Sequence, residues 1–156
     1  MRKNSGFTAF ELAVTLAIMV IITAVALPPY LKWLRGHRLR GAVTNMMADL
    51  EMAKIRAIRE NSLVAVQFCQ DRYTIFNENG DTAYTCDATG RQIYRYRKLP
   101  GGVKINLGDL TFVNNRTRFN GRGLPAGTIA VEQIPIHNQA SGKIISLNRL
   151  GYMNVQ

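Results

Sequence analysis

The sequence has few of the residues that build catalytic and metal centres. Its 156 residues include only 2 cysteines and 2 histidines, and the histidines, His37 and His137, are far apart. A Gly-rich phosphate loop, a GxSxG nucleophile motif and an HExxH metal motif are all missing. We therefore expect no enzyme activity, no metal, no cofactor and no small-molecule substrate.

Acidic residues are also scarce. Asp and Glu number 10 against 20 Lys and Arg, which gives a formal net charge of +10. The cations gather at residues 32–40, 91–98 and 116–122. Basic proteins favour polyanions, either nucleic acid or anionic lipid, although a solvated basic surface has the same composition. Charge alone leaves these three interpretations open.

Charge is nearly absent from residues 7–27, where Glu11 is the only charged side chain. At 1.5 Å per residue this run spans ~30 Å, the thickness of bilayer hydrocarbon, and it exceeds the apolar region of about 7–15 residues in a secretory signal. We predict a membrane helix. Arg2 and Lys3 place its N-terminus in the cytoplasm by the positive-inside rule, but the basic residues 32–40 leave charge counting ambiguous.

Glu11 is the anomaly of this helix. A carboxylate within hydrocarbon is costly, and such a residue usually has a partner and a function. No Lys, Arg or His occurs between Phe7 and Tyr30. A cation would arise there if the chain were cut before Phe7, because the cut creates an α-amine. The alternative is a Glu11 side chain near the interface that is protonated or reaches the headgroups.

The stretch GFTAFELAVTLAI, residues 6–18, resembles the class III signal of type IV pilins and type II secretion pseudopilins. The resemblance implies that a prepilin peptidase cuts after Gly6 and methylates the new N-terminus, Phe7. It also implies that Glu11 pairs with the N-terminal amine of a neighbouring subunit during filament assembly, because a charge pair is favoured over either charge alone in low dielectric. Pro28 matches a proline that is typical of the family.

The helix is expected to continue to about Asn61. Pro28 and Pro29 each remove a backbone hydrogen bond, which predicts a kink or a short melted stretch near residues 24–29. Beyond them, apolar residues recur at helical spacing, which favours packing onto a sheet of the same chain over a coiled coil. These residues are Leu39, Val43, Met46, Leu50, Ala53 and Ala57. The opposite, polar face carries Asp49, Glu51, Arg56 and Glu60.

Short segments with a period of two follow, separated by Gly and Pro, and they predict an antiparallel sheet. The expected strands are residues 64–69, 72–76, 82–86, 92–98, 103–106, 110–113, 116–119, 128–133, 143–147 and 152–155. The predicted fold class is α+β: a long N-terminal helix, membrane-spanning in its first half and kinked at Pro28 and Pro29, packed on an antiparallel β-sheet domain as in type IV pilins.

Four parts are expected along the chain. They are a leader removed by prepilin peptidase (1–6), a transmembrane and filament-core helix (7–30), an amphipathic helix half (31–61) and a periplasmic β domain (62–156). In an exported domain, Cys69 and Cys86 are expected to form a disulfide. The alternative is two buried free cysteines that act as small hydrophobic residues.

The stretch MADLEMAKIRAIRENSLVAVQF, residues 47–68, resembles the GspH/FimT branch of this family. The resemblance implies a minor subunit of a type IV pilus-like filament, in its tip or priming complex, that supports pilus biogenesis. The implied partners are other pilin or pseudopilin subunits, the prepilin peptidase and the inner membrane, which the chain crosses once before it enters a filament. The alternatives are a minor pseudopilin of a type II secretion system and a DNA-binding minor pilin for natural transformation.

Some members of the branch bind DNA through a GRxR element near the C-terminus, but both arginines are missing from the corresponding residues 151–154. Basic residues on predicted strands could contact phosphates instead. In residues 91–98, strand alternation predicts that the three arginines share a face with Ile93, with Tyr94 and Tyr96 on the other face. The candidate phosphate contacts are Arg91, Arg95, Arg97, Arg116, Arg118 and Arg149.

Overall fold

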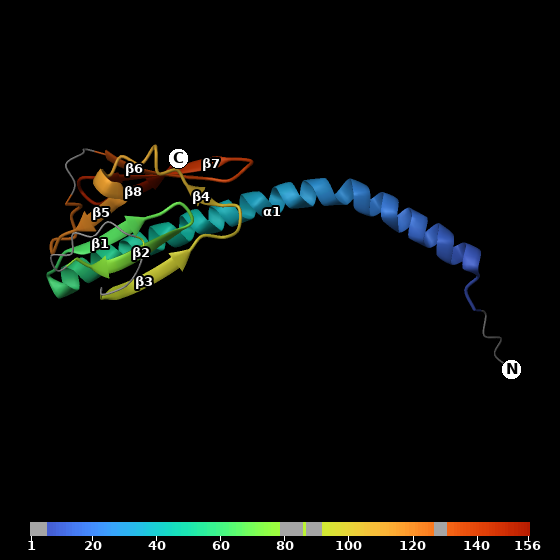
Figure 1. Cartoon of the computed structure of the whole chain (residues 1–156), viewed down its shortest axis with the longest axis horizontal. Helices are drawn as coiled ribbons and strands as arrows, with labels where there is room; N and C mark the ends of the chain where they lie inside the picture. The colour runs from blue at the N-terminus through green and yellow to red at the C-terminus, as the bar shows by residue number, and fades with distance from the viewer. Residues whose placement is uncertain (1–5, 79–85, 87–91, 127–130) are drawn as a thin grey trace. The chain divides into compact units, whose positions relative to one another are not determined.

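The computed structural model describes residues 6–78, 86, 92–126 and 131–156 (Figure 1). The chain divides into two compact units, Met1–Leu34 and Arg35–Gln156, which we call unit 1 and unit 2. One helix, α1 (Ala9–Glu60), supplies residues to both units. It is long and apolar enough to cross a bilayer, and its most apolar window is not buried by any other part of the structure.

The helix α1 runs through Pro28 and Pro29 without interruption. The predicted melted stretch at residues 24–29 is therefore wrong, since every residue in it is helical. The two adjacent prolines remove two amides from the hydrogen-bond ladder, and the amides of the residues on either side of the pair remain available to it. The predicted kink at these prolines stays a prediction. The helix ends at Glu60, as expected, and Asn61 then adopts a positive φ of 45°.

The described residues of unit 2 form two four-stranded sheets, in which every pair of neighbouring strands is antiparallel. The first sheet has the order β3-β2-β1-β5, with β1 (Val64–Phe68), β2 (Arg72–Asn77), β3 (Ile93–Lys98) and β5 (Arg116–Phe119). The second has the order β4-β6-β7-β8, with β4 (Lys104–Ile105), β6 (Val131–His137), β7 (Gly142–Asn148) and β8 (Met153–Val155). The α+β fold class, a long helix on antiparallel sheets, is confirmed.

Two expected strands differ from the structure. Residues 110–113 form no strand; instead the 3-10 turn η1 (Val113–Asn115) begins there, and Asn114 and Asn115 have positive φ values of 57° and 55°. The strand expected at residues 128–133 is found as β6 and continues to His137. The strand expected at residues 82–86 falls outside the described residues except for Cys86.

The strand β6 continues through Pro135 because that residue needs no amide hydrogen. Pro135 lies opposite Ile144 of β7, and the amide and carbonyl of Ile144 bond to Gln156 on its other side. Pro135 and Ile144 therefore form a non-hydrogen-bonded pair, in which the amide of residue 135 points away from β7. Proline is tolerated at such a position.

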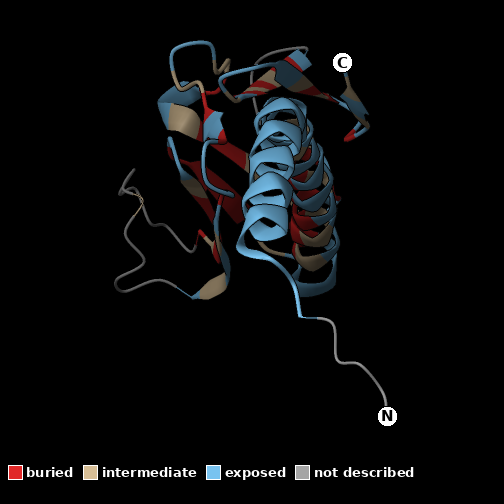
Figure 2. Ribbon diagram, turned by 90° about the vertical axis from the view of Figure 1, so that its right-hand side faces the viewer, coloured by how far each residue is buried: buried red, intermediate tan, exposed pale blue. Residues whose placement is uncertain are grey.

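The apolar stripe predicted on α1 is buried in full. Leu39, Val43, Met46, Leu50, Ala53 and Ala57 form one core with the inward residues of both sheets. Those residues include Val66 and Phe68 of β1 and Ile134 and Ile136 of β6. Figure 2 shows the buried residues gathered between α1 and the strands of unit 2.

Candidate functional site

The N-terminus of α1 is closed by a reciprocal pair of side chains. The Thr8 amide and the Thr8 hydroxyl both donate to Glu11 Oε2, each at 3.0 Å, and the Glu11 amide donates to Thr8 Oγ1 at 3.2 Å. This is a capping box, in which a threonine at the N-cap and a glutamate three residues later satisfy each other's backbone amides. Its sequence signal, T-x-x-E before an apolar run, is present at Thr8 and Glu11.

Gly6 and Phe7 lie just before this cap and are exposed. A cut between them removes none of the three capping hydrogen bonds, because the Thr8 amide belongs to the Phe7–Thr8 peptide bond. The capping box is therefore compatible with a chain that begins at Phe7. No described cation lies within ion-pairing distance of Glu11 in this single chain.

Asp49 of α1 was expected on the polar face of the helix, and that expectation is wrong. The residue is only 4% exposed. Tyr73 donates its hydroxyl to Asp49 Oδ2 at 2.7 Å, Arg97 Nε donates to the same oxygen at 2.6 Å, and Arg95 Nε lies 3.3 Å from Oδ1. Burial, together with the bond to Asp49, raises the pKa of Tyr73, and the same carboxylate raises the pKa of Arg97. Two strands thus attach to α1 through one buried carboxylate.

The sequence correctly predicted that Arg95 and Arg97 share a face, but it placed Ile93 and Tyr94 on the wrong faces. Ile75 of β2 pairs with Arg95, whereas the next residue, Phe76, pairs with Ile93. Tyr94 is therefore an extra residue in a β-bulge, which breaks the alternation. Its hydroxyl donates to Glu60 on α1, and the Arg56 guanidinium lies 4.5 Å from its ring centroid.

Arg116 and Arg118 share a face of β5, because residues two apart on a strand point to the same side, and both approach one carboxylate. Arg116 NH1 lies 3.1 Å from Glu78 Oε1 and Arg118 NH1 lies 3.7 Å from it. The Arg116 side chain is 1% exposed, whereas that of Arg118 is 41% exposed. A buried guanidinium of this kind neutralises Glu78 and has no surface to offer a phosphate.

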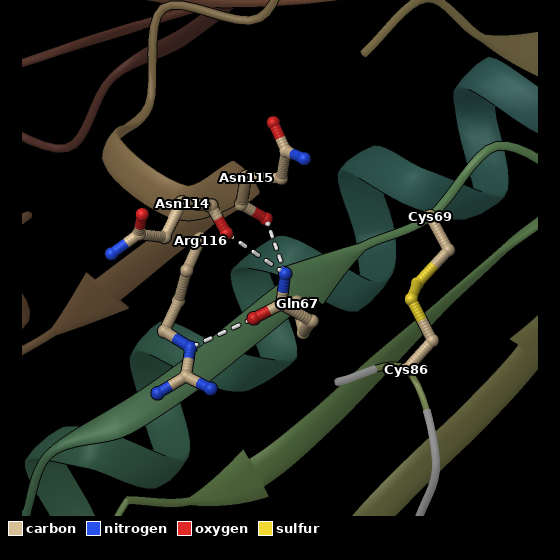
Figure 3. Close-up of a disulfide and its surroundings, with 6 residues drawn as sticks. All are labelled: Gln67, Cys69, Cys86, Asn114, Asn115 and Arg116. Atoms are coloured by element: carbon tan, nitrogen blue, oxygen red, sulfur yellow. Dashed lines mark hydrogen bonds between the residues drawn. A yellow bond between two sulfur atoms is a disulfide. The ribbon is translucent and has the colours of Figure 1, made fainter. Parts of the chain in front are cut away.

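Figure 3 shows how Arg116 is held. Its Nε donates to Gln67 Oε1 at 2.9 Å, and Gln67 Nε2 donates to the carbonyl oxygens of Asn114 and Asn115 at 3.0 and 3.1 Å. The same view shows the disulfide between Cys69 and Cys86, whose Cα atoms are 6.2 Å apart. The predicted disulfide is confirmed. It ties Cys86 to the residue that follows β1.

The basic strands do not form one surface. Arg95 and Arg97 lie in register with Ile75 and Tyr73 and face α1, whereas Arg118 lies in register with Ala65, on the opposite face of the sheet. Residues directly opposite on neighbouring strands share a face, so the registers separate the two groups.

Of the other two candidate phosphate contacts, only Arg149 is described, and it lies apart from both basic strands. Arg149 is exposed in the turn between β7 and β8, and Arg91 lies outside the described residues. Within the described residues, therefore, the structure does not assemble the candidate phosphate contacts into one site.

Glu132 of β6 joins the two sheets. The Thr117 hydroxyl of β5 donates to Glu132 Oε2 at 3.1 Å, and both residues are buried. Burial raises the pKa of Glu132, although the Thr117 bond and the charge of Arg118 act in the opposite direction. Among the described residues, no group of three or more His, Cys, Asp or Glu side chains is placed to hold a metal ion.

Comparison with known proteins gives one family and one fold. The family described as Type II transport protein GspH matches residues 42–151. Two crystal structures of the type IV minor pilin FimU from Pseudomonas aeruginosa strain PAO1 are similar in fold. The first has a TM-score of 0.55 at 13% identity and covers 76% of this chain and 92% of that chain. The second has a TM-score of 0.58 at 11% identity and covers 77% and 89%. No curated relative matches the chain significantly.

Proposed function

The chain belongs to the GspH/FimT family of minor pilins and pseudopilins, and from that membership we propose that it is a minor subunit of the tip or priming complex of a type IV pilus-like filament and supports pilus biogenesis. Minor pilins are structural subunits that assemble with other pilins. The observation that carries the proposal is the division of α1. Its first half is apolar and exposed, whereas its second half carries a folded domain. A second candidate, a minor pseudopilin of type II secretion, is favoured by the match to the family of the type II transport protein GspH.

We propose that the chain is first inserted in the membrane as a precursor and is then processed. The precursor crosses the inner membrane once through residues 7–30, with unit 2 in the periplasm, and prepilin peptidase then cuts after Gly6 and methylates Phe7. Exposure of both residues before the start of α1 supports access by a peptidase. The disulfide supports an oxidising compartment for unit 2, because disulfides are rare in the cytosol.

Glu11 has two roles in this proposal. Within its own chain it caps α1, and in the filament it accepts the N-terminal amine of a neighbouring subunit. The two roles are compatible because the described hydrogen bonds from Thr8 both end on Oε2, which leaves Oε1 for the amine. An incoming subunit would therefore be held in register while the cap stays intact.

Glu11→Gln tests the charge separately from the cap. Glutamine also serves at this position of a capping box, so α1 should still form, but the ion pair is lost. We expect processing and membrane insertion to be unchanged and incorporation into sheared filaments to fall at least tenfold, as measured by immunoblot. Thr8→Ser is the matched control, because it keeps both the cap and the charge. Normal incorporation of the glutamine variant would refute the pairing role. Mass spectrometry of the mature chain should find methylated Phe7 as its first residue.

DNA binding is not part of the proposal, since no specific observation favours it. Arg95, Arg97 and Arg116 are engaged by carboxylates of their own chain. A gel-shift titration at two salt concentrations checks this directly. We expect no complex that weakens with added salt in the way that phosphate contacts require.

A further inference from the structure

A pocket of about 350 Å³ lies at the beginning of unit 2. It is lined by Arg35 and Arg38 of α1, by residues 101–103 between β3 and β4, and by residues 138–139 after β6. We propose that this pocket binds the phosphate of an anionic phospholipid headgroup. The inference rests on the proposed membrane insertion of the precursor and adds a lipid-binding site to it.

The charge of the pocket is the first argument. Its lining contains two arginines and no Asp or Glu. Both arginines are exposed, and the ion pairs among the described residues include neither of them. The sequence has no acidic residue between Glu11 and Asp49. Arginine offers a planar fork of donors that suits phosphate oxygens, so two of them one helical turn apart favour a phosphate ligand.

The backbone opposite the arginines is the second argument. The turn at residues 100–103 is closed by a bond from the Val103 amide to the Pro100 carbonyl, at 3.0 Å, and Gly102 has a φ of 85°. A Cβ atom built at Gly101 or Gly102 meets no atom within 4 Å, so the space over the turn is open. No hydrogen bond among the described residues uses the amides of these glycines. Amides of successive turn residues are common anion ligands.

The third wall of the pocket is held rigidly. Asn138 Nδ2 donates to the Arg35 carbonyl at 2.9 Å, and Asn138 Oδ1 accepts from the amides of Ala140 and Ser141, each at 2.8 Å. The turn after β6 is thus fixed to the backbone of α1 beside the first arginine. A pocket formed in advance loses little conformational freedom on binding.

The position of the pocket in the chain favours lipid over other phosphates. Arg35 is the first residue of unit 2 and lies five residues after the end of the predicted membrane helix, residues 7–30. It comes one helical turn after Lys32, and Tyr30 and Trp33, whose side chains suit the membrane interface, lie just before it. Cations that directly follow a membrane helix are drawn to anionic lipid headgroups.

The test uses the full-length chain in nanodiscs of phosphatidylglycerol or of phosphatidylcholine, with retained lipid measured by native mass spectrometry. We expect preferential retention of phosphatidylglycerol, and roughly 25-fold weaker retention in the double variant Arg35→Gln/Arg38→Gln, because each surface cation contributes about a fivefold factor. The variant keeps the Asn138 bond, which goes to a backbone carbonyl. Arg59→Gln/Arg122→Gln, which removes two exposed arginines elsewhere, should change retention less than twofold.

Hydrogen exchange supplies the location. Phosphatidylglycerol should slow exchange at residues 101–103 in the wild type but not in the Arg35→Gln/Arg38→Gln variant. Equal retention of the two lipids, or equal loss in both double variants, would overturn the proposal. So would equal protection by inorganic phosphate in phosphatidylcholine nanodiscs, or displacement of the lipid by a short DNA duplex. Alkaline extraction distinguishes the proposed membrane insertion from the proposed lipid binding. A chain that fails to insert overturns both proposals, whereas a chain that inserts without lipid preference overturns only lipid binding by the pocket.

Discussion

In unit 1, α1 exposes leucine, isoleucine and valine side chains on all sides, whereas in unit 2 the same helix buries an apolar residue at nearly every turn. Each half also has one acidic residue in an unusual place. Glu11 is satisfied by neighbours in its own first turn, and Asp49 by side chains from two strands. The second half is completed by its own chain, and the first half needs a bilayer or other subunits.

A matched pair of leucines tests this comparison with the largest effect. Leu50 is 1% exposed and Leu12 is 58% exposed. Leu50→Ala should lower the free energy of unfolding of unit 2 by about 3.5 kcal/mol, because it removes buried methyl groups and leaves a cavity. Leu12→Ala should lower it by less than about 0.5 kcal/mol. Urea unfolding in micelles, followed by far-UV circular dichroism, measures both free energies. Equal effects of the two substitutions would contradict the difference between the two halves of α1.

The disulfide should act on unit 2 alone. Reduction of Cys69–Cys86 is expected to cost about 3 kcal/mol, because the open chain regains the freedom of the closed loop. Unfolding with and without reductant measures this difference. The double variant Cys69→Ser/Cys86→Ser is the control, since its unfolding should be insensitive to reductant. A wild-type transition that does not move on reduction would contradict the expectation.

Asp49→Ala should destabilise unit 2 by about 2 kcal/mol. It leaves the buried Tyr73 hydroxyl without its acceptor and two guanidinium groups without their counterion. The loss stays below that of a fully buried ion pair, because both arginines reach water. Glu51 lies two residues after Asp49 in α1 and is exposed, so Glu51→Ala should change the free energy of unfolding by less than about 0.5 kcal/mol. Chemical denaturation compares the two variants, and similar losses would show that Asp49 is not special.

Glu132 is a second buried carboxylate, and it differs from Asp49 in its partner: the Thr117 hydroxyl, rather than a guanidinium, donates a hydrogen bond to it. Its pKa is raised in the folded protein, so the folded state binds the proton more tightly than the unfolded state. Ionisation therefore lowers stability at neutral pH, and this loss disappears as the pH falls below 4.5, the unfolded value. Glu132→Gln should raise the thermal midpoint at pH 7 by a small amount and leave it unchanged at pH 4. An equal gain at both pH values would contradict a titration effect.

Several features of unit 2 could be predicted from local sequence. The spacing of Leu39, Val43 and Met46 identified the buried face of α1, because a helix returns to one face every three or four residues. Alternation identified most strands to within a residue or two. The T-x-x-E signal of the capping box was also local, and it was available at Thr8 and Glu11 without any structure.

Other features were not local. The bulge at Tyr94 inverts two side chains, and it depends on how β3 pairs with β2 rather than on any residue within β3. Asp49 looks like an ordinary surface acid in a helical pattern. Its burial follows from Arg95, Arg97 and Tyr73, which arrive from strands that are 24 or more residues away in sequence. The sequence similarly indicates that Arg116 could bind phosphate, but the tertiary structure places Glu78 beside it.

The sequence by itself determined the helix, its apolar face, the cysteine pair and the membership in a pilin family, because each of these can be recognised from residue types and their spacing along the chain. The tertiary structure alone decided which charges are available to a partner. A charge is available only when no opposite charge of the same chain neutralises it, and that depends on contacts between distant strands. The arginines of β3 and β5 are largely engaged in this way, whereas Arg35 and Arg38 at the start of unit 2 face an open pocket.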